Sequence, residues 1–270
     1  MAVRHPVGAE SATLALCHSV RGKIRRAGWV PDLDRRPRDF SAEMNIIARW
    51  IKALISHLPR AVQFELKRAY YLFQIRRGTF IPNEPEIAAI PSLVRPGDWT
   101  IDVGANVGYY TCQLARCVGP TGRVLAFEPI ALTFELLAAN VRALGTRNIT
   151  LFNVAASSSA AVVGMDIPMF SETGLDNLYQ ARLTGRGEHT VLCLPIDGIP
   201  IPQPIRLVKI DAEGHDLEVL KGMESLIRRD RPVLIVEAAD VGDIANWLRA
   251  RGYTISKAPG SSNIFAKPAA

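Results

Sequence analysis

The sequence predicts an α/β fold, a doubly wound and mostly parallel sheet with helices on both faces, preceded by a helical N-terminal extension. Strand-length apolar runs alternate with helix-length segments after Pro96, which is typical of βαβ units. A glycine-rich turn joins the first of these strands, Trp99–Val103, to the next helix. Four acidic residues lie at or directly after the ends of predicted strands: Asp102, Glu128, Asp211 and Glu237. Ligands of parallel sheets bind at that edge.

Length and charge suggest two parts. The chain has 270 residues, 48% of them hydrophobic and 21% charged, an ordinary globular balance. Residues 1–80 hold 15 Lys and Arg against 6 Asp and Glu, whereas residues 81–270 hold 17 against 20. We therefore expect a basic, mainly helical extension over 1–80 and a catalytic domain over 81–270. The basic part suits an anionic surface or partner, or simply a solvated helical face.

Helical patterns dominate the first part. A short helix is compatible with Thr13–Ala27, and Ser41 suits the N-cap of a helix over Ala42–Leu58. A second helix is expected over Arg60–Ile75, and a third over residues 84–90, ended by Pro91. The apolar stripe of the second helix consists of Val62, Leu66, Ala69, Tyr70 and Phe73. The aromatic cluster Tyr70, Tyr71 and Phe73 is expected to pack in the core rather than to bind a ligand.

The catalytic domain should contain alternating strands and helices. Its expected strands are Trp99–Val103, Arg123–Phe127, Ile149–Ala155, Ile205–Ile210, Pro232–Val236, Tyr253–Ser256 and Asn263–Ala266. Its expected helices are Tyr109–Val118, Ala131–Leu144, Leu217–Arg229 and Val241–Arg251. The segment Ser157–Leu194 lacks helical periodicity and is expected to form additional strands and loops.

Targeting signals are absent from the sequence. No apolar run is long enough to span a bilayer, and charged residues and histidines interrupt the N-terminus where a signal peptide would need an apolar core. The four cysteines show no C-x-x-C spacing, which favours free thiols in a reducing compartment. We expect a cytoplasmic protein with a small-molecule or glycan substrate and no nucleic-acid partner.

The glycine turn differs from a dinucleotide site. Gly104 and Gly108 are spaced G-x-x-x-G, so the G-x-G-x-x-G fingerprint is missing. Asp102 ends the strand before them, and its carboxylate would repel a pyrophosphate but suit a ligand with cationic groups. Glu128 ends the second strand, where a carboxylate can accept hydrogen bonds from two ribose hydroxyls. NAD sites use the same device, so Glu128 alone does not select a cofactor.

Four segments together resemble a known family. They read DVGANVGYYT from Asp102, FEP from Phe127, KIDAEGHDLEVLKG from Lys209 and RPVLIVE from Arg231. This sequence resembles the FkbM family of class I S-adenosylmethionine-dependent methyltransferases from about Glu84 to Phe265. The resemblance implies a Rossmann-like, seven-stranded sheet whose last strand is antiparallel. It also implies methylation of oxygen, commonly a hydroxyl on a sugar, glycolipid or polyketide.

The resemblance implies S-adenosyl-L-methionine as the cofactor and indicates which residues bind it. Asn153 and Ala155 end the third strand and should lie near the adenine. The remaining cofactor-binding residues are expected to be Asp102, Gly104, Ala105, Asn106, Gly108, Glu128 and Pro129.

The acceptor hydroxyl must lose a proton, so a general base is expected beyond the fourth strand. Asp211 is nearest the strand end, Glu213 follows it, and His215 titrates nearest neutral pH. Glu213 or His215 could instead cap the next helix. The same cluster could hold a divalent metal, but the sequence locates no further ligands, so no metal residue is assigned.

Two alternatives remain. A nicotinamide-dependent oxidoreductase is disfavoured by the glycine spacing and by Asp102. A non-catalytic binding protein would keep the fold and dock through its basic extension, but the intact acidic positions argue against a decayed site. The sequence does not identify the acceptor, the oligomeric state or the role of residues 1–80.

Overall fold

A computed structural model describes residues 55–82, 84–167, 182–184, 187, 189–237, 241–257 and 260–269. The predicted helix Thr13–Ala27 and most of the predicted helix Ala42–Leu58 lie outside these residues. None of the helices in the described part is long and apolar enough to cross a bilayer.

The main sheet has seven strands in the order β10-β11-β9-β8-β1-β2-β3. Strand β11 runs antiparallel to both of its neighbours, and the central pairs are parallel. The strands are β1 (Trp99–Val103), β2 (Arg123–Phe127), β3 (Ile149–Phe152), β8 (Ile205–Ile210), β9 (Val233–Glu237), β10 (Tyr253–Lys257) and β11 (Asn263–Pro268). The predicted mostly parallel sheet with an antiparallel last strand is confirmed.

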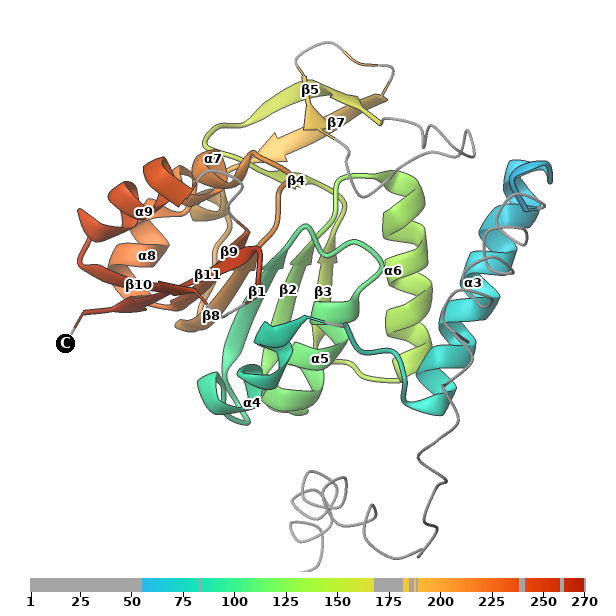
Figure 1. Cartoon of the computed structure of the whole chain (residues 1–270), viewed down its shortest axis with the longest axis horizontal. Helices are drawn as coiled ribbons and strands as arrows, with labels where there is room; N and C mark the ends of the chain where they lie inside the picture. The colour runs from blue at the N-terminus through green and yellow to red at the C-terminus, as the bar shows by residue number, and fades with distance from the viewer. Residues whose placement is uncertain are drawn as a thin grey trace, which may run out of the picture. The chain divides into compact units, whose positions relative to one another are not determined.

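Helices cover both faces of this sheet (Figure 1). On one face, α5 (Tyr109–Val118) and α6 (Ala131–Leu144) pack on the first strands through apolar clusters that include Leu114 and Leu137. On the other face lie α7 (Asp216–Lys221), α8 (Glu224–Asp230) and α9 (Val241–Arg249). The large cluster under them includes Val208 and Leu234. Burial of both faces explains why these strands are largely apolar.

A second, four-stranded sheet lies beyond the carboxyl ends of the main strands (Figure 1). Its strands are β4 (Ala155–Ala156), β5 (Ala161–Asp166), β6 (Arg182–Leu183) and β7 (His189–Leu194). The expected strand-rich character of this region is therefore confirmed where it is described. The single predicted strand Ile149–Ala155 is wrong, because the chain leaves the main sheet at Asn153. The Asn153 amide donates to the carbonyls of Glu128 (2.9 Å) and Pro129 (3.1 Å), and the next residues join the second sheet.

Two helix boundaries differ from the expected ones. Pro91 does not end a helix, since η1 (Pro85–Ala88) is followed by α4 (Ile90–Leu93), and a proline is tolerated in a first turn, whose N–H groups lack intrahelical partners. The expected helix Leu217–Arg229 is two helices. The Gly222 carbonyl accepts from the backbone of Asp197, and the Asp197 carboxylate accepts from the Ser225 and Leu226 N–H groups (2.8 and 2.9 Å), which starts α8 anew.

The first described long helix, α3 (Arg60–Arg77), packs beside α6 (Figure 1). The predicted core packing of its aromatic cluster is confirmed for Tyr71 but wrong for Tyr70 and Phe73. Tyr71 is the buried residue of α3, and Phe64 and Ile75 pack with it against Phe80. The large residues of the predicted stripe are exposed instead: Val62, Leu66, Tyr70 and Phe73. Both stripes have helical spacing, so the sequence periodicity could not distinguish them.

Candidate active site

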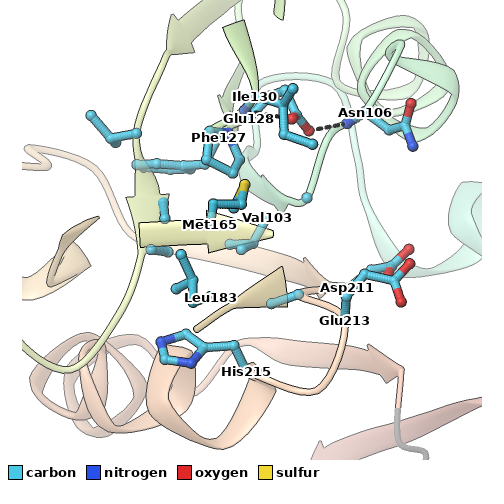
Figure 2. A pocket seen from close by; sticks show the side chains of 16 residues that line it. Val103, Asn106, Phe127, Glu128, Ile130, Met165, Leu183, Asp211, Glu213 and His215 are labelled. Carbon is cyan, nitrogen blue, oxygen red and sulfur yellow. Dashed lines mark hydrogen bonds between the residues drawn. The ribbon is translucent and has the colours of Figure 1, made fainter. Parts of the chain in front are cut away.

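A pocket opens at the carboxyl edge of the main sheet, below the second sheet (Figure 2). The loop after β1 contributes Gly104 and Asn106, and the loop after β8 contributes Asp211, Glu213 and His215. The apolar part of the wall comes from strands of both sheets and from the loops that follow the main strands. It consists of Val103, Phe127, Pro129, Ile130, Val154, Ala155, Ala156, Met165, Leu183 and Ala212. The sequence analysis missed Met165 and Leu183, which reach the pocket only because the second sheet folds over it.

Gly104 is required for the loops to meet. Its φ is +71°, and a Cβ there would lie 1.8 Å from the backbone oxygen of Asp211. The carbonyl of the candidate base segment therefore lies directly against the glycine turn. Gly108 has φ +98° and begins α5, but it does not line the pocket. Gly108 allows the turn to form, since its φ is positive and a Cβ there would lie 2.7 Å from Leu137.

The Glu128 carboxylate links the glycine turn after β1 to the end of β2 through hydrogen bonds. One carboxylate oxygen accepts from the Asn106 N–H and the other from the Ile130 N–H, both at 2.9 Å (Figure 2 shows the first). Burial raises the pKa of Glu128 to about 7, and these two backbone hydrogen bonds only partly offset that effect. Each carboxylate oxygen has a further lone pair, so Glu128 can still accept from a ligand.

Asp102 lies beneath the pocket rather than in its wall. Its side chain is fully buried, one oxygen accepts from the Thr111 hydroxyl at 2.5 Å, and the other has no hydrogen-bond partner among the described residues. Burial raises the pKa of Asp102 to about 6, against the lowering effects of Lys209 and Thr111. A buried, unpartnered carboxylate oxygen attracts positive charge, whether it contacts a ligand or acts through the intervening residues.

The other expected cofactor residues divide into two groups. Asn106, Pro129 and Ala155 line the pocket together with Gly104 and Glu128. Ala105 and Asn153 do not line it. Asn153 holds the carbonyls of Glu128 and Pro129, so its contribution to the site is to shape the loop after β2.

The segment after β8 has an unusual backbone. Glu213 has φ +50° and Gly214 φ +90°, so two consecutive residues are left-handed. The Asp216 carboxylate stabilises this turn by accepting from the N–H groups of Ala212 (2.9 Å) and Gly214 (3.2 Å). His215 is the N-cap residue of α7, but its side chain makes no capping hydrogen bond. The side chain of His215 is therefore available for another role.

Lys209 is the cation of this site, and the sequence analysis assigned it no function. It pairs in register with Asp102 across β1 and β8, so both side chains lie on the same face of the sheet. The Lys209 ammonium lies 2.7 Å from an Asp211 oxygen and 4.9 Å from the centre of the Tyr110 ring. Burial lowers the pKa of Lys209, but Asp211 and Asp102 more than compensate, so the pKa is raised and Lys209 remains charged.

Asp211 and Glu237 form a hydrogen-bonded carboxyl pair. Burial alone would raise the pKa of Asp211, but Lys209 and the Glu237 hydrogen bond bring it below its ordinary value. The same hydrogen bond, with burial, raises the pKa of Glu237 to about 8. Near neutral pH the two carboxyl groups therefore titrate as one coupled pair, with the ionised form favoured at Asp211, beside Lys209. Asp211, Glu213 and Glu237 each have an oxygen within 4.8 Å of the others, a spacing that could hold a divalent metal.

His215 is separate from these carboxylates. Figure 2 shows its ring pointing away from Asp211 and Glu213, which point together toward the other side of their loop. Its Nε2 lies 2.9 Å from the Ser157 hydroxyl at the end of β4, and burial lowers its pKa. The three candidate bases thus do not converge on one point.

A family model described as the methyltransferase FkbM domain matches residues 102–255, more than half of the chain. This chain belongs to the FkbM family of class I S-adenosylmethionine-dependent methyltransferases. The match begins at Asp102 and includes all three loops that form the pocket.

Two curated proteins show similarity over parts of this FkbM chain. The hexuronic acid methyltransferase AglP of Haloferax volcanii is 30% identical over 139 residues, which are 50% of this chain and 53% of AglP. The methyltransferase sdnD of Sordaria araneosa is 26% identical over 211 residues, 63% of this chain and 78% of sdnD. The chain therefore spans about half the length of AglP.

Among solved structures, the methyltransferase FkbM of Methylobacillus flagellatus KT is 19% identical, with a TM-score of 0.49. That match covers 84% of this chain and 60% of the other.

S-adenosylmethionine fits the residues of the pocket. Its adenine and ribose suit the apolar wall beside Phe127 and the carboxylate of Glu128, and its ammonium and sulfonium suit the acidic end. The observation that tests this fit is Asp102, directly before the pocket-lining Val103. One of its buried carboxylate oxygens has no hydrogen-bond partner among the described residues, and a cationic ligand nearby would stabilise that carboxylate.

Proposed function

We propose that this chain transfers a methyl group from S-adenosylmethionine to a hydroxyl oxygen of a sugar, glycolipid or polyketide-type acceptor, and that Asp211 receives the hydroxyl proton. The observation that carries the proposal is the position of Asp211 in the pocket wall, 2.7 Å from the buried ammonium of Lys209, which favours an ionised carboxylate. The cofactor supplies a methyl group that is already activated. The protein therefore has to position the acceptor oxygen and accept its proton.

The low pKa of Asp211 is compatible with this role. A hydroxyl oxygen that is forming its bond to the methyl carbon gains positive charge and becomes strongly acidic, so a weak base suffices. What matters is that the base is ionised and fixed in position. Lys209 provides both, because its ammonium donates to Asp211 at 2.7 Å, and the hydrogen bond with Glu237 also lowers the pKa of Asp211.

His215 supports the segment rather than the reaction in this proposal. Its ring is hydrogen-bonded to Ser157 and points away from Asp211, and this orientation argues against a shared proton relay. Glu213 lies beside Asp211 and is suited to accept a hydrogen bond from a second hydroxyl of a polyol.

The acidic wall also bears on which sugars fit. The similarity to AglP supports a sugar acceptor, and the printed name of AglP specifies a hexuronic acid. In this chain, Asp211 and Glu213 line the pocket and Glu237 lies beside them, so a carboxylate on the acceptor would meet like charge. We therefore propose a neutral hydroxyl compound in preference to a uronic acid.

The test is methylation by the purified full chain with methyl-labelled S-adenosylmethionine, using neutral glycosides and their uronic acid counterparts as matched acceptors. We expect an O-methyl product by mass spectrometry, with neutral acceptors preferred. Asp211→Asn should abolish turnover while cofactor affinity is retained, and Asp166→Asn, an exposed residue outside the pocket, should change neither. Cofactor binding with no product from any acceptor would favour a binding protein, and an N-methyl product would refute the proposal.

A further inference from the structure

Helix α3 presents a second apolar stripe on the side away from its packed face. The packed face contacts α6 and the cluster that contains Tyr71, Phe80 and Leu136. The opposite stripe, called here the α3 outer face, consists of Val62, Leu66, Tyr70 and Phe73. These positions are spaced by four, four and three residues, so they lie on one side of the helix.

The α3 outer face is well exposed. The exposed fractions of its side chains are 43%, 44%, 56% and 54% in chain order, and Ile81, which follows the helix, is 48% exposed. Among the residues that the structure describes, no other helix has more than one exposed large hydrophobic side chain. A contiguous exposed stripe of this kind indicates an interaction surface, whereas single exposed apolar residues are ordinary.

The charges around the face favour an anionic partner. Helix α3 contains five Lys and Arg residues and one Glu. Arg76 and Arg77 lie in its last turn, and the Arg77 guanidinium lies 4.8 Å from the centre of the Phe73 ring. A basic helix whose apolar side carries aromatic residues is typical of segments that lie in the interface of a membrane.

We propose that the α3 outer face docks this protein on an anionic bilayer surface, with Tyr70 and Phe73 in the headgroup region and Arg76 and Arg77 against lipid phosphates. A second copy is a poorer occupant. Two α3 helices packed face to face would bring like charges together, and a stripe of four side chains is narrow beside the roughly 800 Å² per partner of a stable protein interface. The inference does not depend on the acceptor or on the catalytic base.

The experiment is co-sedimentation of the full chain with vesicles of phosphatidylcholine alone and with about one third phosphatidylglycerol. We expect binding to the anionic vesicles that decreases as salt rises, because the lipid charge is screened. Tyr70→Ser/Phe73→Ser should weaken binding roughly tenfold or more, since two aromatic side chains no longer leave water. Arg76→Gln/Arg77→Gln should also weaken it at low salt.

A matched control comes from the second sheet. Val162 and Leu192 pair across β5 and β7 and are 73% and 43% exposed, so Val162→Ser/Leu192→Ser removes comparable apolar surface from another face. This control should bind vesicles like the wild type. Circular dichroism and cofactor binding would establish that each variant is folded.

Three results would overturn the proposal. The first is equal vesicle binding by the Tyr70/Phe73 variant and the wild type, and the second is absence of wild-type binding at low salt. The third is a change from dimer to monomer in that variant with vesicle binding unaltered, which would assign the face to self-association.

Discussion

The two ends of the pocket hold their carboxylates by different means. Glu128, beside the glycine turn, is held by two backbone N–H groups at 2.9 Å, and its pKa is nevertheless raised to about 7 by burial. Asp211, after β8, is held by the Lys209 ammonium at 2.7 Å and by a hydrogen bond with the Glu237 carboxyl, and its pKa is lowered.

This difference shows what keeps a buried carboxylate ionised. Two backbone hydrogen bonds do not offset the effect of burial on the pKa of Glu128. The Lys209 ammonium, 2.7 Å from Asp211, helps to offset that effect for Asp211. The Glu128 carboxyl is therefore more easily protonated near neutral pH, whereas Lys209 favours the ionised form of Asp211. The following predictions test this difference between Glu128 and Asp211.

The largest effect is expected for Lys209→Met. Loss of the ammonium should raise the pKa of Asp211, so turnover at pH 7 should fall roughly 100-fold or more, the usual weight of a general base. The loss should diminish at higher pH, because Asp211 ionises again there. The pH profile of turnover measures this shift. A uniform loss across pH would show that Lys209 only supports the fold, and Lys209→Arg should retain most of the rate.

Glu128→Ala should weaken S-adenosylmethionine binding by about 1–3 kcal/mol, because the ribose hydroxyls lose a charged partner and the Asn106 and Ile130 N–H groups lose theirs. The fold should persist, since Glu128 lies at a strand end. Calorimetry measures the affinity. Glu128→Gln, which keeps the shape and one acceptor, should lose less, and an unchanged affinity in the alanine variant would remove Glu128 from the cofactor site.

The ligand-free protein should lose stability as pH rises. The pKa values of Asp102, Glu128 and Glu237 are raised in the folded state to about 6, 7 and 8, so their contributions are present below about pH 4 and are lost as pH passes through those values. Asp211 acts oppositely, because its lowered pKa adds stability above its unfolded value. Denaturant unfolding between pH 5 and 8 should detect a net loss of stability as pH rises.

Cofactor binding should reverse this trend, because a cationic ligand favours the ionised carboxylates. The rise in Tm on adding S-adenosylmethionine should therefore be greater at pH 8 than at pH 5.5. An equal rise at both pH values would mean that these carboxyl groups do not change their charge when the cofactor binds.

The smallest effect is expected for Ser157→Ala. The variant removes the hydroxyl that lies 2.9 Å from His215, so the imidazole loses one partner while Asp211 keeps all of its own. Turnover should change less than about fivefold, the range of one neutral hydrogen bond. A loss comparable to that of Asp211→Asn would instead make His215 a participant in proton transfer.

Local sequence patterns determined the sheet and the approximate position of the site. Strand–helix alternation predicted the parallel sheet because each apolar strand must be covered on both faces. The Asp102, Glu128 and Asp211 positions followed from strand ends, since parallel strands share one carboxyl edge. The spacing of Gly104 and Gly108 showed from the sequence alone that the dinucleotide-binding fingerprint is missing. The family resemblance then indicated the antiparallel last strand.

Only the tertiary structure decided features that depend on contacts between distant segments. Lys209 is a single lysine within an otherwise largely apolar strand, and the sequence does not show what its ammonium contacts. Its role becomes clear only because β8 pairs with β1 and places Lys209 beside Asp102. The break at Gly222 requires Asp197, 25 residues earlier, to begin α8. Helix α3 has two apolar stripes of equal periodicity, and packing on α6 selected the one with Tyr71. Periodicity reports which residues share a side of a helix, but a partner surface determines which side is buried.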